Sequence, residues 1–142
     1  MERIGVVGSR KNADIPGVLE FIRRLWDAQP DSIVVSGGAI GVDETAEDEW
    51  FRLGGQVISF RPFQTDAGSY GVEEWRFGPR ENEILRHVVP TFADYTSALF
   101  FRSSMIVEIA DRLVSFTNPA YSPGTKFTKY IAHEIPSYEM VA

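Results

Sequence analysis

Three polar, glycine-containing segments are the part of this sequence best suited to bind a ligand. The first is Gly8-Ser9-Arg10, the second runs from Ser36 to Asp43, and the third is Ser122-Pro123-Gly124-Thr125. Each is expected to follow a buried strand and to lead into a helix, so each can present backbone N–H groups and the positive end of a helix dipole. If the three turns share one crevice, the chemistry they favour is the binding of an anion such as phosphate.

The second segment has the sharpest pattern. Its residues that can line a bound anion are Ser36, Gly37, Gly38, Ala39 and Gly41. The glycines lack the Cβ atoms that would keep a phosphate away from the backbone. The segment is not a Walker A loop, because no Gly-Lys-Ser/Thr follows, and it lacks the Gly-x-Gly-x-x-Gly spacing of a dinucleotide fold. Two glycines after a strand also fit a tight connection without a ligand, so the inference depends on all three turns together.

Two side chains near these turns can contact such a ligand directly. Arg10 follows the first glycine, and its guanidinium suits bidentate binding of a phosphate. Asp43 falls in the first turn of the helix expected after the second segment, where it can bind a ribose hydroxyl. Acidic residues are also favoured at helix starts by the dipole alone, so a purely local role for Asp43 stays open.

The composition excludes several other kinds of site. The 142 residues include no cysteine and only two histidines, His87 and His133. The absence of cysteine excludes zinc held by cysteine, disulfides and a thiol nucleophile. The two histidines disfavour a histidine-rich metal site and a Ser-His-Asp triad. We therefore expect no metal and no cofactor. The formal charge of −6 disfavours general nucleic-acid binding, although eleven of the fourteen basic residues are arginine and can form a local cluster.

Short apolar runs alternate with helical patterns, and these elements must position the turns. The sequence predicts five strands, at residues 3–8, 32–36, 56–60, 112–117 and 137–141. It predicts helices from Ile15, with Asp14 as N-cap and Pro16 in the first turn, from Val42 to about Leu53, and from Thr125 to Glu134. This alternation indicates βαβ units, so the expected class is α/β with a mainly parallel sheet of about five strands in one domain, residues 1–142.

The middle of the chain is less regular. We predict a long surface loop from Arg61 to Gly78, because glycine, proline and aromatic residues interrupt any simple period. Helical pattern is expected from Pro79 to about Val88, is interrupted at Pro90 and continues from Thr91 to Ala110. Three aromatic residues of the loop are expected to pack over the sheet edge, or alternatively to form a lid or stack on a base: Tyr70, Trp75 and Phe77.

The helices expected after Pro90 are unusually apolar, which is typical of a core or of a face between two copies of a chain. The residues concerned are Phe92, Tyr95, Leu99, Phe100 and Met105, and they predict a homodimer or higher homo-oligomer. No segment approaches the roughly 20 apolar residues that span a bilayer, and the apolar run after Met1 is too short for a signal peptide. We therefore expect a soluble, cytoplasmic protein with no membrane partner.

Four segments of the sequence together match a known pattern. They are Val7-Gly8-Ser9-Arg10, residues 34–43, residues 106–116 and Pro123-Gly124-Thr125. These segments resemble the SLOG superfamily of Rossmann-like nucleotide-binding domains, which includes the Lonely Guy phosphoribohydrolases and the DNA-processing A proteins. The resemblance covers most of the chain apart from a family-atypical insertion at about residues 62–97. It implies a Rossmann-like three-layer sandwich that holds a nucleotide or nucleotide-derived ligand through the glycine turns, with Thr125 fixing further polar groups of the ligand.

The chain departs from the family pattern at two places that matter for activity. Lonely Guy enzymes carry a Pro-Gly-Gly-x-Gly-Thr-x-x-Glu motif whose glutamate serves glycosidic cleavage, whereas Thr128 stands at that place here. A threonine cannot act as acid or base near neutral pH, so it stays open whether the chain is an enzyme. Many relatives also carry an Arg-Asn pair before the fourth strand. Arg102-Ser103 has the matching distance and is the expected phosphate or base contact, with Arg80 as the alternative.

Three functions remain open at this point. The first is a domain that binds or senses a nucleotide or nucleotide-like small molecule in the crevice between the turns at Gly8, Gly37 and Gly124. The second is an enzyme that cleaves an N-glycosidic bond of a nucleotide, with Asp43 or Glu108 in place of the missing glutamate. The third is a single-strand DNA-binding module, which the net charge of −6 makes the least favoured of the three.

Overall fold

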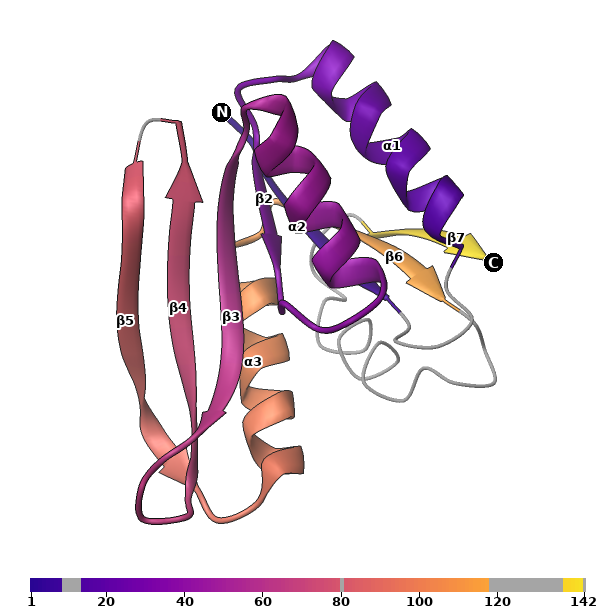
Figure 1. Ribbon diagram of the computed structural model, residues 1–142. Helices are drawn as coiled ribbons and strands as arrows, with labels where there is room; N and C mark the ends of the chain where they lie inside the picture. The colour runs from indigo at the N-terminus through magenta and orange to yellow at the C-terminus, as the bar shows by residue number, and fades with distance from the viewer. Residues whose placement is uncertain (9–13, 80, 118–136, 142) are drawn as a thin grey trace.

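The computed structural model describes residues 1–8, 14–79, 81–117 and 137–141. Within these residues the chain forms seven strands and three helices (Figure 1). In chain order they are β1 (Arg3–Gly8), α1 (Ile15–Ala28), β2 (Ile33–Ser36), α2 (Val42–Leu53), β3 (Gln56–Gln64), β4 (Tyr70–Gly78), β5 (Glu81–Phe92), α3 (Tyr95–Ile109), β6 (Arg112–Thr117) and β7 (Ser137–Val141).

All seven strands belong to one sheet, in the order β5-β4-β3-β2-β1-β6-β7. Five neighbouring strands of this sheet pair in parallel, namely β3, β2, β1, β6 and β7. The other pairs are antiparallel, so β3, β4 and β5 form a meander. The expected α/β class with a mainly parallel sheet is confirmed, with two strands more than the five expected. The chain builds β2 and β3 on one side of β1 and then returns to place β6 on the other side. The strand order therefore reverses between β1 and β6, where open α/β sheets form ligand crevices.

Helices cover both faces of the parallel part of the sheet. Figure 1 shows α1 and α2 on one face and α3 on the other, which is the expected three-layer sandwich. Each face has its own buried core. The first includes Ile22 of α1 and Trp50 of α2, and the second includes Ile106 of α3 packed against sheet residues. In Figure 1 no described helix lies over β4 and β5 on the side of the sheet that carries α2.

The helix ends follow the local sequence signals. Asp14 caps α1 by accepting a hydrogen bond from the N–H of Gly17 at 3.1 Å, and Pro16 lies in the first turn, as predicted. The start of α2 is different, because its N-cap is Gly41, which has no side chain to cap the helix. Gly54 ends α2 in the left-handed conformation with φ 106°.

The prediction for the middle of the chain was wrong. The segment expected as a loop from Arg61 to Gly78 is instead the second half of β3, a short turn and all of β4. The segment expected as a helix from Pro79 to Val88 is strand β5, which continues to Phe92. The segment forms a strand despite its helical sequence pattern, because its backbone pairs with β4. Pro90 is tolerated because β5 is an edge strand of the sheet.

The last helix before β6 begins later than expected. Its start was predicted at Thr91, but α3 begins at Tyr95, where Asp94 caps it by accepting from the N–H of Ser97 at 2.8 Å. The predicted final strand is confirmed as β7, parallel to β6. The predicted helix from Thr125 to Glu134 lies outside the described residues. No helix in the described part of the chain is long and apolar enough to cross a membrane.

Candidate functional site

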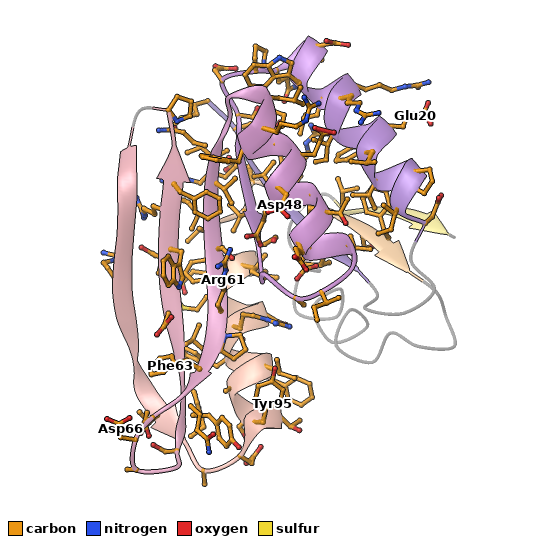
Figure 2. All side chains as sticks on the ribbon, in the orientation of Figure 1. Glu20, Asp48, Arg61, Phe63, Asp66 and Tyr95 are labelled. Carbon is orange, nitrogen blue, oxygen red and sulfur yellow. The ribbon has the colours of Figure 1, made fainter. Side chains whose placement is uncertain are left out.

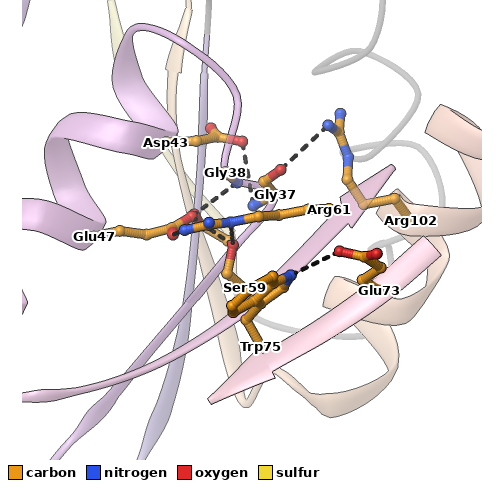
Figure 3. A network of polar contacts seen from close by, with 10 residues as sticks. Gly37, Gly38, Asp43, Glu47, Ser59, Arg61, Glu73, Trp75 and Arg102 are labelled. Atoms are coloured by element: carbon orange, nitrogen blue, oxygen red, sulfur yellow. Dashed lines mark hydrogen bonds and ion pairs between the residues drawn. The ribbon is translucent and has the colours of Figure 1, made fainter. Parts of the chain in front are cut away.

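The glycine turn after β2 is bound to its own following helix. The N–H of Gly37 donates to Oδ2 of Asp43 at 3.2 Å, and the N–H of Gly38 donates to Oε2 of Glu47 at 2.8 Å (Figure 3). Asp43 and Glu47 are one helical turn apart on α2, so both side chains reach the same turn. The two N–H groups that the sequence suggested for a phosphate are therefore used by carboxylates of the protein itself.

Glu47 is the centre of this network. Its side chain is 1% exposed, and Oε2 also accepts hydrogen bonds from the hydroxyls of Ser36 and, at 3.0 Å, Ser59. Its second oxygen, Oε1, accepts from Nη2 of Arg61 at 3.0 Å. A buried carboxylate is costly unless donors surround it, and here donors from β2, the turn and β3 do so. Glu47 thereby joins the ends of two neighbouring strands to α2.

Asp43 has unused hydrogen-bonding capacity. The residue is 4% exposed, and no side chain or backbone group in the described part of the chain donates to its Oδ1. Burial raises the pKa of this carboxyl from 3.8 to about 7, and the neighbouring Glu47 acts in the same direction. The positive charge of Arg102 and the backbone hydrogen bonds from Gly37 and Ala39 act against this rise in pKa. Asp43 can therefore accept a hydrogen bond or exchange a proton near neutral pH.

Arg102 reaches the glycine turn from the opposite face of the sheet. It lies on α3, and its Nη1 donates to the carbonyl oxygen of Gly37 at 3.4 Å (Figure 3). A Cβ at position 37 would lie 2.8 Å from Nε of Arg102, so the arginine fills the space that the glycine leaves. The structure thus brings together the predicted residues Gly37, Asp43 and Arg102, although α2 and α3 lie on opposite faces.

Arg61 is a second guanidinium at the same turn. Its Nε donates to the hydroxyl of Ser59 at 3.0 Å, and its side chain runs across Gly38. Gly38 has φ 66°, and a Cβ there would lie 2.7 Å from Cγ of Arg61. The guanidinium carbon lies 5.5 Å from the ring centroid of Trp75 and 5.8 Å from that of Phe77. Gly38 is therefore required both by the backbone conformation and by the packing of Arg61.

The end of β1 is packed tightly at the point where the strand order reverses. Gly8 is paired with Phe116 of β6, and a Cβ at Gly8 would lie 2.5 Å from the carbonyl oxygen of Phe116 and 2.6 Å from Cγ2 of Val42. The close approach of β6 and α2 thus explains this glycine. Glu108, the other carboxylate considered for catalysis, lies in the last turn of α3. That turn leads to Asp111, which accepts from the N–H of Arg3 at the start of β1, so Glu108 is at the opposite edge of the sheet.

The remaining predicted site residues divide into two groups. Ala39 and Gly41 lie in the connection from β2 to α2, where their carbonyl oxygens accept from the N–H groups of Glu44 and Thr45. Five predicted residues lie outside the described part of the chain: Ser9, Arg10, Arg80, Gly124 and Thr125.

Sequence reasoning missed Glu47, Ser59 and Arg61. A usable signal for Glu47 was its four-residue spacing from Asp43 next to the buried positions Ala46 and Trp50, which places it on the inner side of the helix. Ser59 was a polar residue inside an otherwise apolar strand, which indicates a buried hydrogen-bonding partner. Arg61 carried no such signal, and it was predicted at the start of a loop and not in a strand.

A shallow pocket elsewhere does not belong to this site. It is lined by residues such as Trp26, Asp31, Gln56 and Pro79, at the edge of the sheet where β2 and β3 begin. The glycine turn lies at the other edge, where β2 ends. Within the described residues, no three histidine, aspartate or glutamate side chains gather as a metal site.

No protein-family model and no curated protein matches the chain. Two solved structures are similar over nearly its whole length. DNA processing protein A from Helicobacter pylori, described for its single-stranded DNA binding mode, has a TM-score of 0.68 at 17% identity. That match covers 97% of this chain but 64% of the other, so the chain spans just under two thirds of that protein. TM1055, a structural-genomics target, has a TM-score of 0.63 at 23% identity, with 96% of this chain and 72% of the other covered. The chain therefore shares the Rossmann-like α/β fold of these two structures.

Proposed function

We propose that this chain binds a nucleotide or nucleotide-derived phosphate ligand at the carboxyl ends of β1, β2 and β6, as a sensor or binding domain. One observation carries the proposal. Arg102 and Asp43 come from helices on opposite faces of the sheet and meet at Gly37, within one strand of the place where the strand order reverses. A cation and a carboxyl group placed together at a switch point suit a ligand that has both an anionic and a hydroxyl end.

The two ends of the ligand have different partners in this proposal. Arg102 neutralises the phosphate, together with the positive end of α2 and with Arg10, which is included on the sequence pattern alone. Asp43 accepts a hydrogen bond from a ligand hydroxyl through Oδ1, the oxygen to which no described group donates. The N–H groups of Gly37 and Gly38 stay on Asp43 and Glu47, so their role is to fix the turn. Gly124 and Thr125 are assigned to the ligand on the family resemblance alone.

Calorimetric titration tests the proposal. The ligands are nucleoside monophosphates and ADP-ribose, and the proteins are the wild type, Arg102→Ala and, as a control, Arg24→Ala. Arg24 lies on α1 in an exposed pair with Glu20, so its removal makes the same change in charge away from the turn. We expect at least one ligand to bind, and Arg102→Ala to weaken it by about 10- to 100-fold, as for a charge-assisted hydrogen bond. The absence of binding across the panel, or equal effects of both substitutions, would contradict the proposal.

A second candidate function is cleavage of an N-glycosidic bond in a nucleotide. The observation that favours it is the Asp43 pKa of about 7, because a general acid or base works best when its pKa is near the working pH. Asp43 would protonate the leaving base or activate water in place of the glutamate that the Lonely Guy motif has and this chain lacks. Chromatography of incubated nucleoside monophosphates decides this case. Release of free base that Asp43→Asn abolishes would support it, and intact nucleotides would exclude it for those substrates.

A third candidate is single-stranded DNA binding, which the likeness to DNA processing protein A suggests. The charge near the described turn argues against it, since Arg61 is paired with Glu47 and the whole chain has a net charge of −6. A DNA-binding surface predicts affinity for oligothymidylate that falls steeply with salt. Fluorescence anisotropy at two salt concentrations would show this, whereas no binding at low salt would exclude it.

The homo-oligomer expected from the sequence remains a prediction. Tyr95 and Phe100 on α3 are large side chains with 40% and 39% of their surface exposed, as a contact between copies of the chain would require. Sedimentation equilibrium of the wild type and of Phe100→Ser distinguishes the possibilities. A dimer that the substitution dissociates would support the α3 face, and a monomeric wild type would contradict it.

A further inference from the structure

The side of β4 that faces α2 carries an aromatic ring near the glycine turn. Trp75 on β4 is paired in register with Ser59 on β3, so its indole stands on the side of the sheet that faces α2. Its Nε1 donates to Oε2 of Glu73 at 3.0 Å, which fixes the orientation of the ring (Figure 3). Figure 2 shows this part of the sheet around Arg61 without a helix over β4. The ring is therefore oriented before any ligand arrives.

Arg61 connects this ring to the turn. Its guanidinium lies 5.5 Å from the Trp75 ring centroid, which is within the range of a cation–π contact, and the same side chain packs on Gly38. The ion pair with buried Glu47 fixes the guanidinium from the other end. Even so, 40% of the Arg61 side chain is exposed. A guanidinium, held by an ion pair, and an indole, held by a hydrogen bond, thus lie side by side in a partly accessible position at the edge of the candidate site.

We infer that Trp75 and Arg61 form a subsite for the planar heteroaromatic ring of the ligand, that is, for a nucleobase. The inference rests on the proposed function, because it assigns the base of the ligand whose phosphate is bound by Arg102. Bases stack on indole rings and on guanidinium planes, and such stacking tolerates any base because each has a π-face. Arg102 contacts Gly37, and Arg61 contacts the next residue, Gly38. The phosphate subsite at Arg102 and the base subsite at Arg61 therefore lie beside adjacent residues of one turn.

The site favours a ring over a second phosphate at Arg61. The charge of Arg61 is already compensated by Glu47, and Glu73 places a further carboxylate beside Trp75. An anion would be repelled by both carboxylates, whereas a neutral ring gains from stacking and keeps the ion pair intact. The subsite is built from β3 and β4, in the region where the resemblance to the SLOG pattern is interrupted.

Paired titrations of wild type and Trp75→Leu test the subsite. The probes are AMP, GMP, CMP and UMP, with ribose 5-phosphate as the probe that lacks a base. We expect Trp75→Leu to weaken the binding of the monophosphates by about 5- to 100-fold, as for the loss of one base stack, and to leave ribose 5-phosphate unchanged. Trp75→Phe should restore most of the affinity, because it keeps a ring. Phe51→Leu is the control, since Phe51 is an exposed aromatic on the same side that packs on Phe77.

The outcomes separate this inference from the proposed function. If the monophosphates bind wild type and Trp75→Leu equally well, the subsite is wrong and the proposed function stands. The subsite is also wrong if Trp75→Leu weakens ribose 5-phosphate by the same factor, because the substitution then acts on the fold. If no monophosphate binds the wild type, both proposals fail together. Thermal unfolding of each variant checks that the protein remains folded in these titrations.

Discussion

The buried carboxylate of Glu47 accepts the hydrogen bond that the N–H of Gly38 donates, at 2.8 Å. The acid therefore takes a place that an anionic ligand would otherwise compete for. The glycine turn is held in shape by its own helix, and the recognition of a ligand passes to side chains around it. This relationship has consequences for stability that can be measured without knowing the ligand.

Replacing Glu47 should cost much of the stability of the fold. Glu47→Ala leaves the N–H of Gly38 and the hydroxyls of Ser36 and Ser59 without their acceptor and removes the partner of Arg61. We expect a loss of about 2–4 kcal/mol in the free energy of unfolding, with the part due to Arg61 reduced by its exposure. Urea unfolding measures it. Asp48→Ala, at an exposed position on the same helix, is the control and should change stability by less than about 0.5 kcal/mol. Similar losses for both would show that the network contributes little.

Two glycines with positive φ should respond differently to the same substitution. Gly38 has φ 66° and lies against Arg61, whereas Gly68 has φ 86° and a Cβ there would meet nothing within 4 Å. Gly68→Ala should therefore cost only the backbone strain, about 1 kcal/mol, and Gly38→Ala about 2–4 kcal/mol, because Arg61 must also move. The comparison is made by thermal and urea unfolding. Equal costs at the two positions would mean that Arg61 does not pack on the turn.

The pH dependence of stability should reveal Asp43. Its pKa in the folded protein is about 7, above the ordinary value of 3.8, because the carboxyl is buried. The folded state therefore holds the proton more tightly than the unfolded state. The free energy of unfolding falls as the pH rises from near 3.8 to about 7 and stays low above that. Urea unfolding at several pH values, for wild type and Asp43→Asn, isolates the effect. Parallel curves for the two proteins would contradict the raised pKa.

Glu49 should give the opposite pH dependence. It joins α1 to α2 by an ion pair with Arg23, and it also pairs with Arg52 on its own helix. The hydrogen bond from Arg52 is the main cause that lowers the pKa of Glu49 below 4.5. Its contribution is present above that ordinary value and is lost as the pH falls through the lowered pKa. Because both arginines are mostly exposed, Glu49→Gln should cost only about 1 kcal/mol at neutral pH. Glu20→Gln removes an exposed pair with Arg24 and should lower the free energy of unfolding by less. A larger loss for Glu20→Gln than for Glu49→Gln would contradict this prediction.

The regular parts of the fold were predictable because each carried its own local signal. The strands ending at Gly8 and Ser36 are short β-branched runs stopped by glycine, and α1 has a cap, a proline and a helical period. The antiparallel extension was not predictable in this way. β4 alternates correctly, with Trp75 and Phe77 on one face, but its glycines resembled loop residues. β4 is a strand because it pairs with the neighbouring strands β3 and β5, and β5 carries a helical pattern that hides this pairing in the sequence.

Part of the candidate site was also predictable from the sequence, and part was not. Gly37, Asp43 and Arg102 were predicted, and the structure places them together. Arg61 and Trp75 were not joined to them, because the strand pairing that brings β4 beside the turn depends on the misassigned segment. The role of the glycines also differs from the prediction, since the space beside Gly37 and Gly38 is filled by arginine side chains. Only the packed structure shows which atoms approach a glycine.

The most direct measurement of the central claim is a crystal structure of the chain with the nucleoside monophosphate that it binds most tightly. We expect density for the phosphate within hydrogen-bonding distance of Arg102, a ribose hydroxyl at Oδ1 of Asp43, and the base stacked with Arg61 and Trp75. Density for the nucleotide at the other edge of the sheet, in the pocket beside Trp26 and Gln56, would contradict it.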